Sequence, residues 1–257
     1  MSASPDIRIV LVRPRNSGNV GSAVRALRNF GFAAPRIVDM YAFDAEEARR
    51  LAAGCEANVA EIEFFPDLES ALADRSFVVG TTSQHRRHWR LEPIDQALPT
   101  FNQTQWEKAA ILFGNEQSGL SEEEMRVCER LVTIPTVEYT SLNLAQAVLL
   151  TAWEIRKTLT QRPLERGPEL APRELTEPMF EQMFEALERI SFLHPGQDTR
   201  VRAMLRQLFS RNGVTRRDVQ VLRGIWHQVL WLAGVKGVNV PAESPEETEK
   251  SQQGGQE

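Results

Sequence analysis

The sequence is poor in cysteine and has no long apolar run, and these absences exclude several classes of protein. Its 257 residues include two cysteines, Cys55 and Cys128, which are too few for a disulfide framework or a four-cysteine zinc site. No apolar stretch approaches the roughly 20 residues that span a bilayer. The N-terminus lacks the basic flank, apolar core and cleavage site of a signal peptide. We therefore expect a cytoplasmic protein in which both cysteines are small buried side chains.

A large excess of charge is also absent, because 30 basic residues stand against 35 acidic ones. The distribution is nevertheless uneven. Residues 241–257 hold five acids and one lysine, residues 1–38 hold six arginines and one aspartate, and residues 197–236 hold eight bases and two acids. The two basic regions are suited to an anionic partner. Arginines that simply solvate helix faces explain them equally well.

Short apolar strands alternate with helices through the first 160 residues. Continuous apolar strands, rather than alternating ones, are typical of a parallel sheet covered on both faces. We predict strands at 7–12, 36–40, 59–65, 77–82, 109–114 and 131–135. We predict helices at 22–31, 45–54, 67–74, 121–129 and 141–159.

The composition changes after residue 160. Residues 161–178 contain four prolines and little periodicity, which predicts a linker. Residues 179–237 have helical spacing and no strand-like run, so we predict a small helical domain. Residues 238–257 are acidic and rich in Gln and Gly, which predicts a disordered tail.

Three polar loops follow predicted strands, where open parallel sheets bind ligands. The first, NSGNVGSAVR at 16–25, lacks the G-x-G-x-x-G fingerprint of a dinucleotide site. Its glycines, Gly18 and Gly21, are also explained by an ordinary strand-to-helix turn. Asn19 and Arg25 are its polar candidates.

The second loop, FGNEQSGLS at 113–121, has the glycine spacing of a phosphate-binding P-loop at Gly114 and Gly119. Leu120 stands where that motif needs a lysine, so a nucleoside-triphosphate site is poorly supported. What remains is a glycine loop that carries Glu116 and precedes a helix with the capping-box pair Ser121 and Glu124.

The third loop lies within TIPTVEYTSLNLAQAV at 133–148. Pro135 ends a strand, and Ser141 and Asn143 lie at the mouth of an apolar helix. Helix capping explains one of these polar residues. Two of them suggest, weakly, that a small polar ligand is held there.

In this order the three loops resemble the motifs of the SPOUT RNA methyltransferases, in the branch that methylates ribose 2′-hydroxyls. The matching residues are Asn19, Gly21 and Arg25, then FGNEQSGL, then SLNLAQAV, and the resemblance covers residues 7–160. Further blocks are similar to the bacterial tRNA cytidine/uridine 2′-O-methyltransferases that act at anticodon-loop nucleotide 32. These blocks are IRIVLV, LAAG at 51–54, VVGTT, EYTSLNLA, HPGQ, RQLF and LRGI. The GNEQSGL loop is less basic than in those tRNA enzymes, which leaves the exact RNA open.

The resemblance implies an α/β fold with a parallel sheet flanked by helices and a C-terminal trefoil knot, followed by a small α-helical domain. The domains are then a methyltransferase domain at 1–160, the linker at 161–178, a helical RNA-binding or accessory domain at 179–237 and the tail. The knot would bind S-adenosylmethionine. The implied cofactor-binding residues are Thr81, Thr82, Ser83, Gly114, Ile134, Ser141, Leu142 and Asn143.

The resemblance also implies a catalytic set of Arg25, Asn19 and Ser141. A guanidinium stays protonated in proteins, so we expect Arg25 to stabilise the developing alkoxide and bind the adjacent phosphate rather than act as a base. Asn19 and Ser141 would orient the ribose or Arg25. Glu116 would support the site by fixing the loops or by pairing with Arg25.

The implied partners are tRNA and a second copy of the chain, with one active site built from both subunits; no membrane or DNA partner is expected. In SQHRRHWR at 83–90, Arg86, Arg87 and Arg90 are candidate RNA contacts, and a solvated loop is the alternative. His85 and His88 have no third ligand nearby, so we expect no metal site. The alternative functions are a ribosomal-RNA methyltransferase of the same branch and a non-catalytic RNA-binding protein of the same fold.

Overall fold

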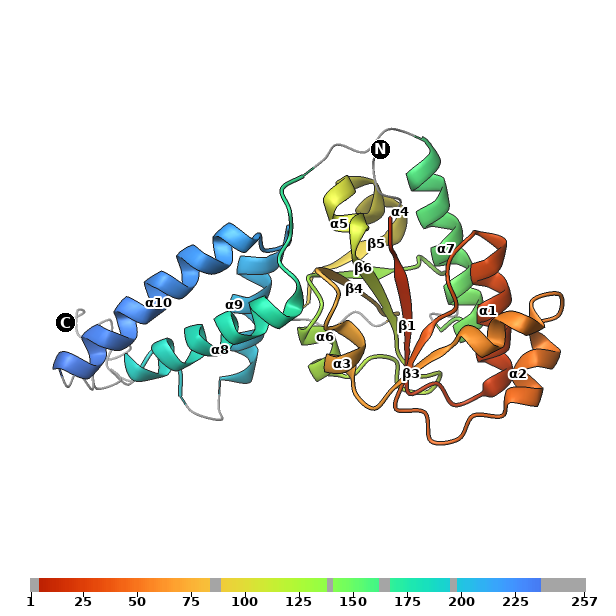
Figure 1. Cartoon of the computed structure of the whole chain (residues 1–257), viewed down its shortest axis with the longest axis horizontal. Coiled ribbons are helices and arrows are strands. Elements are labelled where there is room, and N and C mark those ends of the chain that lie inside the picture. The colour runs from red at the N-terminus through yellow and green to blue at the C-terminus, as the bar shows by residue number, and fades with distance from the viewer. Residues whose placement is uncertain (1–4, 84–88, 138–140, 162–166, 195–197, 237–257) are drawn as a thin grey trace, which may run out of the picture.

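The computed structural model describes residues 5–83, 89–137, 141–161, 167–194 and 198–236. Figure 1 shows an α/β part, formed by the described residues up to 161, beside the helices that follow it in the chain. No helix in the described ranges combines the length and the apolarity needed to cross a lipid bilayer.

A seven-stranded sheet forms the centre of the α/β part, in the order β3-β2-β1-β6-β4-β7-β5. All of its strand pairs are parallel, which confirms the predicted sheet. The strands are β1 Arg8–Val12, β2 Arg36–Val38, β3 Glu63–Phe65, β4 Phe77–Thr81, β5 Leu91–Pro93, β6 Ala109–Phe113 and β7 Arg130–Thr133.

Helices cover both faces of this sheet, because side chains alternate along each strand. Ile9 and Leu11 of β1 point into the core that also holds residues of α1 and α7. Val10 and Val12 point into the opposite core, which α3 and α6 cover. The helices of the α/β part are α1 Ser17–Asn29, α2 Ala45–Leu51, α3 Leu68–Leu72, α4 Ile94–Ala97, α5 Gln103–Glu107, α6 Glu122–Arg126 and α7 Leu144–Gln161, with 3₁₀ turns η1 Glu56–Glu61 and η2 Leu98–Thr100.

The first polar loop is largely helical, contrary to the prediction. Helix α1 begins at Ser17, because the Asn16 side chain caps it by accepting a hydrogen bond from the Asn19 amide at 2.8 Å. Gly21 lies inside this helix, where a Cβ would come within 2.0 Å of the Ala48 carbonyl oxygen. The glycine therefore serves close packing of α1 against α2.

The strand predicted at 59–65 is wrong over its first half. The 3₁₀ turn η1 occupies residues 56–61, and β3 begins at Glu63. Val59 and Ile62 are both buried, and their spacing of three fits a helical turn rather than the period of two of a strand. Helix α7 likewise begins at Leu144 rather than at 141. The Asn143 side chain accepts a hydrogen bond from the Ala145 amide there.

The C-terminal part contains α8 Arg173–Arg189, α9 Thr199–Ser210 and α10 Arg216–Lys236. Helix α8 begins before the end of the predicted linker, so residues 173–178 are helical. A core of its own holds these helices together, with Met179, Phe180, Met183, Leu187 and Val214 among its buried members.

A buried ion network joins this part to the sheet. Glu129, just before β7, accepts a hydrogen bond from the Val78 amide at 2.6 Å and one from Arg173 of α8 at 2.9 Å. Arg173 also donates to Glu177 at 2.7 Å, and Arg206 of α9 forms two further bonds to Glu177. Burial raises the pKa of Glu129, while the Arg173 charge opposes that rise.

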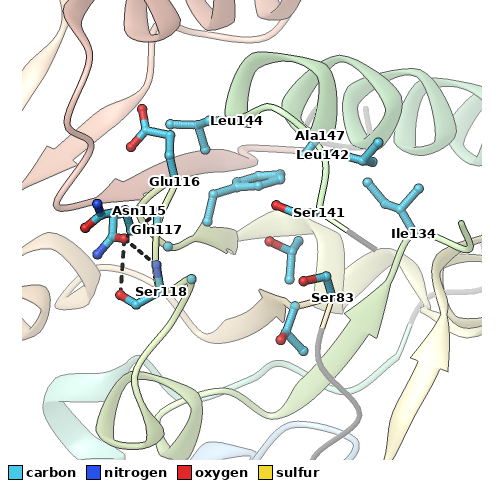
Figure 2. A pocket seen from close by; sticks show the side chains of 15 residues that line it. Ser83, Asn115, Glu116, Gln117, Ser118, Ile134, Ser141, Leu142, Leu144 and Ala147 are labelled. Atoms are coloured by element: carbon cyan, nitrogen blue, oxygen red, sulfur yellow. Dashed lines mark hydrogen bonds between the residues drawn. The ribbon is translucent and has the colours of Figure 1, made fainter. Parts of the chain in front are cut away.

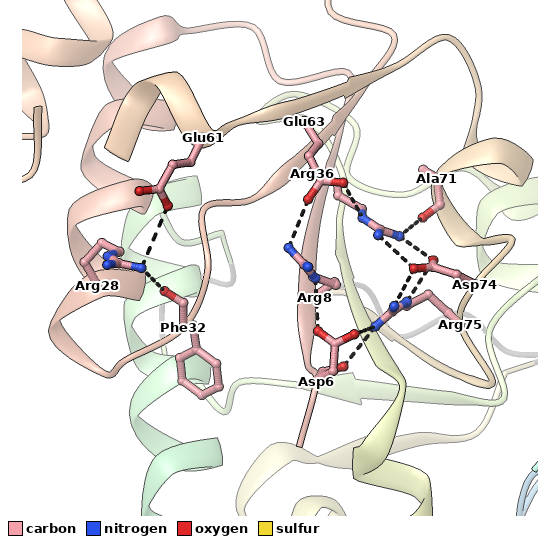
Figure 3. Close-up of polar contacts among 10 residues, drawn as sticks. All are labelled: Asp6, Arg8, Arg28, Phe32, Arg36, Glu61, Glu63, Ala71, Asp74 and Arg75. Carbon is pink, nitrogen blue, oxygen red and sulfur yellow. Dashed lines mark hydrogen bonds and ion pairs between the residues drawn. The ribbon is translucent and has the colours of Figure 1, made fainter. Parts of the chain in front are cut away.

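A second ion network lies at the amino ends of the strands (Figure 3). Asp74 accepts hydrogen bonds from Arg36 at 2.6 and 3.0 Å and from Arg75 at 2.9 Å. Burial by itself would raise the pKa of Asp74, but the two guanidinium groups outweigh it and hold that pKa well below its usual range. This network ties β2 to the segment before β4, at the edge of the sheet opposite the polar loops.

Candidate active site

A cavity of about 230 Å³ lies at the carboxyl ends of β4, β6 and β7. These strands are neighbours in the sheet, with β4 between β6 and β7, so the loops that leave them meet at one edge. Figure 2 shows Ile134 and Leu142 on one side of the cavity and Asn115–Ser118 on the other. The lining residues are Thr81, Thr82, Ser83, Phe113, Gly114, Asn115, Glu116, Gln117, Ser118, Gly119, Ile134, Ser141, Leu142, Leu144 and Ala147.

Most of the residues predicted to bind the cofactor share this cavity. The predicted residues that line it are Thr81, Thr82, Ser83, Gly114, Ile134, Ser141 and Leu142. Asn143 lies beside it and is bonded to Asn19 rather than lining the wall. The second and third loops therefore converge on one site.

The loop after β6 folds back on itself, and its glycines have a structural purpose. The Asn115 side chain accepts hydrogen bonds from the Gln117 amide at 3.0 Å and from the Ser118 amide at 2.8 Å. Gly119 has a φ of +65°, and a Cβ on Gly114 would lie 1.9 Å from the carbonyl carbon of Gly119. The Gly114–Gly119 spacing thus builds a tight loop, and no lysine is needed to explain it.

Glu116 connects all three polar loops. It accepts a hydrogen bond from the Asn19 side-chain amide at 2.8 Å and another from the Arg15 backbone amide at 3.0 Å. The Asn19 side-chain oxygen in turn accepts from the Asn143 side chain at 2.9 Å. Glu116 therefore links the first two loops directly and the third through Asn19, and its supporting role in the reaction stays a prediction. The alternative, pairing with Arg25, does not occur within one chain.

Sequence reasoning missed Arg15 and Gln117. The Arg15 guanidinium donates a hydrogen bond to the Gln117 side chain, which places an arginine at the cavity mouth beside Glu116. The only sequence signal was the arginine-rich character of residues 1–38. That signal does not distinguish Arg15 from its neighbours.

Arg25 does not belong to this cavity within one chain. It is exposed on α1, about 9 Å along the helix axis from Asn19. The Arg25 guanidinium makes no hydrogen bond or ion pair with any residue that the structure describes. Its charge acts weakly on Glu56, whose pKa is lowered mainly by a hydrogen bond from the Gly54 amide.

The predicted RNA contacts are only partly described. Arg90 is exposed before β5, whereas Arg86, Arg87, His85 and His88 lie outside the described residues. Within the described ranges, no group of three or more His, Cys, Asp or Glu side chains is arranged to hold a metal ion.

Comparison with known proteins shows the family of this fold. The sequence profile of the SpoU rRNA methylase family matches residues 6–153. The chain belongs to the SpoU methylase family. A second profile, the C-terminal domain of the tRNA methyltransferase TrmJ, matches residues 174–239.

Individual relatives of this SpoU methylase agree with the two profiles. The tRNA (cytidine/uridine-2′-O-)-methyltransferase TrmJ of Yersinia pestis (strain Pestoides F) is 33% identical, over 86% of this chain and 90% of its own. The enzyme of that name from Pectobacterium atrosepticum is 32% identical, over 87% and 96%. The crystal structure of TrmJ from Z. mobilis ZM4 superimposes with a TM-score of 0.74 at 28% identity, over 89% of this chain and all of that one.

Membership of the family makes the chain an RNA methyltransferase that uses S-adenosylmethionine, and the cavity residues fit that methyl donor. Ile134, Leu142 and Leu144 supply apolar surface suited to the faces of an adenine, and Ser83 and Ser141 supply hydroxyls. Glu116 supplies a carboxylate at the wall, which suits a ligand that carries positive charge.

Proposed function

We propose that this SpoU methylase transfers a methyl group to the ribose 2′-hydroxyl of cytidine or uridine 32 in the anticodon loop of tRNA, in the cytoplasm. The observation that carries the proposal is the meeting of the second and third motif loops in one cavity, joined to Asn19 of the first through Glu116. The TrmJ C-terminal profile at 174–239 supports tRNA over ribosomal RNA. The trefoil knot belongs to this proposal as the fold that would shape the cofactor site.

In the proposed reaction, S-adenosylmethionine supplies an activated methyl group when bound. The chain's own residues then position the methyl donor and the ribose hydroxyl relative to one another. Thr81 is held by a hydrogen bond from its hydroxyl to the Leu112 carbonyl at 2.8 Å, and Thr82 by its amide to the Val132 carbonyl at 3.0 Å. These bonds fix the wall of the cavity at the end of β4. Ser141 would orient the ribose.

Arg25 would act across a dimer interface. Its guanidinium is exposed and outside the cavity of its own chain, so a second protomer is needed to bring it to a reacting ribose. Nearby, the rings of Phe30 and Trp153 lie 5.8 Å apart, and Leu149, Leu150 and Trp153 of α7 are exposed. We propose that this apolar surface pairs two copies, and that Arg25 of one then stabilises alkoxide charge at the cavity of the other.

The first test is methyl transfer from labelled S-adenosylmethionine to unmodified tRNA, with mapping of the modified nucleotide. We expect transfer to a ribose at position 32, loss of at least about a hundred-fold in rate with Arg25→Ala, and little change with Arg28→Ala, the matched control on the same helix. Transfer to ribosomal RNA alone would redirect the assignment to that substrate. Failure to bind the methyl donor would leave a non-catalytic RNA-binding protein.

The composite site has its own test. Leu142→Glu places a charge in the cavity and should abolish cofactor binding, whereas Arg25→Ala should leave it intact. In a mixed dimer of the two inactive variants, the Arg25→Ala protomer supplies an intact cavity and the Leu142→Glu protomer supplies an intact Arg25. One of the two sites is then complete, so activity should reappear on mixing. An inactive mixture, with subunit exchange demonstrated, would place Arg25 at the cavity of its own chain.

A further inference from the structure

A groove separate from the cofactor cavity runs between the α/β part and helix α9. It consists of two hollows of about 180 and 210 Å³ that share Gln207 as a lining residue. The α/β part contributes Trp89, Arg90, Glu92, Glu122, Arg126, Glu129, Arg130 and Leu131, and the C-terminal part contributes Arg200, Val201, Ala203, Met204, Gln207, Arg211 and Asn212. We call this surface the α9 groove.

The α9 groove gathers positive charge that the protein itself does not neutralise. Arg90, Arg200 and Arg211 are exposed, and none of their guanidinium groups forms a hydrogen bond or ion pair with a residue in the described part of the chain. Three guanidinium groups gathered around two joined hollows, without acids of their own, create a positive potential that favours an anionic ligand.

The carboxylates of the groove are already engaged. Glu92 receives two hydrogen bonds from Arg130, at 2.8 and 2.6 Å. Glu129 is bonded to Arg173 in the buried network, and Glu122 lies 3.6 Å from Arg126 of the same helix. These carboxylates therefore neutralise the arginines with which they are paired. The positive charges of Arg90, Arg200 and Arg211 remain available to an anionic ligand.

The larger hollow also exposes apolar surface. Met204 is 62% exposed although it faces a hollow lined by Trp89 and Val201. The Trp89 ring packs partly on the core beneath α6, which holds it in place. A fixed aromatic edge beside a flexible thioether suits contact with an unstacked nucleobase, and neighbouring arginines suit the phosphates on either side of it.

The α9 groove lies close to the cofactor cavity. Gly119 lines the cavity and Glu122 lines the groove, so their Cα atoms are at most about 11 Å apart. Ser83 likewise lines the cavity and Trp89 lines the groove, six residues further along the sequence. The groove therefore lies within reach of the nucleotides that flank a ribose bound at the cavity.

We propose that the α9 groove binds the single-stranded RNA that flanks the methylated nucleotide. Phosphates lie against Arg90, Arg200 and Arg211, and a base lies against Trp89 and Met204. The two parts of the chain form this site jointly, so the C-terminal helices contribute directly to substrate binding. The inference rests on the proposed function, since it assumes that the anionic ligand is the RNA being methylated.

The test compares two double variants that remove the same charge. The groove variant, Arg90→Ala/Arg211→Ala, removes two guanidinium groups from the groove. The control variant, Arg49→Ala/Arg189→Ala, removes two exposed arginines elsewhere. We expect the groove variant to bind tRNA at least about ten-fold more weakly. We also expect its plot of log affinity against log salt to be shallower by roughly 1 to 2, because each phosphate contact contributes about 0.7–0.9 to the slope. The control should match the wild type.

A second pair of variants separates charge from shape at Gln207. Gln207→Glu adds a negative charge with almost no change in size, and we expect tRNA binding to weaken several-fold. Gln207→Lys should bind as tightly as the wild type or more tightly. Equal weakening by both substitutions, or wild-type binding by the Arg90→Ala/Arg211→Ala variant, would overturn the proposal.

Two further measurements separate this proposal from the function on which it rests. Binding of S-adenosylmethionine and the thermal unfolding midpoint should be unchanged in all these variants. If the wild-type protein neither binds nor methylates tRNA, the proposed function fails. If the wild type does both and the groove variants equal it, only the α9 groove fails.

Discussion

At the scale of single residues, Glu116 has the most consequential contacts of the site. Its two carboxylate oxygens hold Asn19 and the Arg15 amide, and Asn19 holds Asn143. The sequence marks Glu116 as the one acid in a glycine loop. The residues that donate hydrogen bonds to Glu116 are distant from it in the sequence, so no local pattern identifies them.

Glu116→Gln should lower kcat for methyl transfer by about ten-fold or more, because glutamine keeps one acceptor oxygen and replaces the other with an NH2 group that donates. One of the two hydrogen bonds is then lost, and Asn19 and Asn143 lose their orientation. Glu123→Gln removes the same charge from an exposed position nearby and is the matched control. Single-turnover rates at saturating tRNA measure the effect. Equal rates for the two variants would show that the contacts of Glu116 have no catalytic consequence.

Asp74 gives a residue-scale prediction for pH. Because its folded pKa is depressed, its ion pairs stabilise the fold above the unfolded value of about 3.9, and this stability is lost as pH falls through the lower folded pKa. Asp74→Asn should cost about 1–2 kcal/mol at pH 7, a modest figure because the side chain is half exposed to screening water. Denaturant unfolding should show this cost shrinking below about pH 4. A cost independent of pH would contradict the assignment.

At the scale of elements, periodicity predicted most strands and the long helices, and it failed where elements were short. Residues 91–107 contain β5, α4, η2 and α5, yet none has enough turns or alternations to produce a recognisable period. The spacing of Gly18 and Gly21 predicts a loop, whereas both glycines lie in helix α1. A glycine at a helix crossing and a glycine in a turn look alike in sequence, and only the neighbouring helix distinguishes them.

Substitution by alanine should have opposite effects at two helical glycines, one at the α1–α2 contact and one in an open position on α10. Gly21→Ala should destabilise the fold by roughly 2 kcal/mol or more, because its Cβ would meet backbone atoms of Ala48. Gly224→Ala in α10 meets nothing within 4 Å and should stabilise by about 0.5–1 kcal/mol through helix propensity. Chemical denaturation of both variants measures the difference. A stabilising Gly21→Ala would mean that α1 and α2 move apart without cost.

At the scale of the whole molecule, the Glu129–Arg173–Glu177–Arg206 network fixes the C-terminal helices against the sheet. Burial makes each charge dependent on its partner, because a buried carboxylate without a counter-ion is strongly disfavoured. The α9 groove lies across this same junction. The network thereby fixes the relative position of the two surfaces that we propose to bind RNA, one on the α/β part and one on α9.

Arg173→Met should destabilise the protein by about 3–5 kcal/mol, since it leaves Glu129 buried without its partner. Arg216→Met breaks an exposed pair with Glu169 and should cost less than about 1 kcal/mol. The deficit of Arg173→Met should be smaller at pH 5 than at pH 7.5, because the raised pKa of Glu129 lets it take up a proton on folding. Urea unfolding at both pH values tests this sign, and a deficit that grows at low pH would contradict it.

The sequence by itself determined the alternation of strands and helices, the all-parallel sheet and the three motif loops that identify the family. These features follow from local periodicity and from residue types that a short segment displays. Only the tertiary structure decided that Glu116 binds Asn19, that Arg25 lies outside the cavity of its own chain, and that arginines from both parts line one groove. Contacts between distant segments depend on the order of strands and the path of the chain. No local pattern encodes these, because each segment would look the same with a different neighbour.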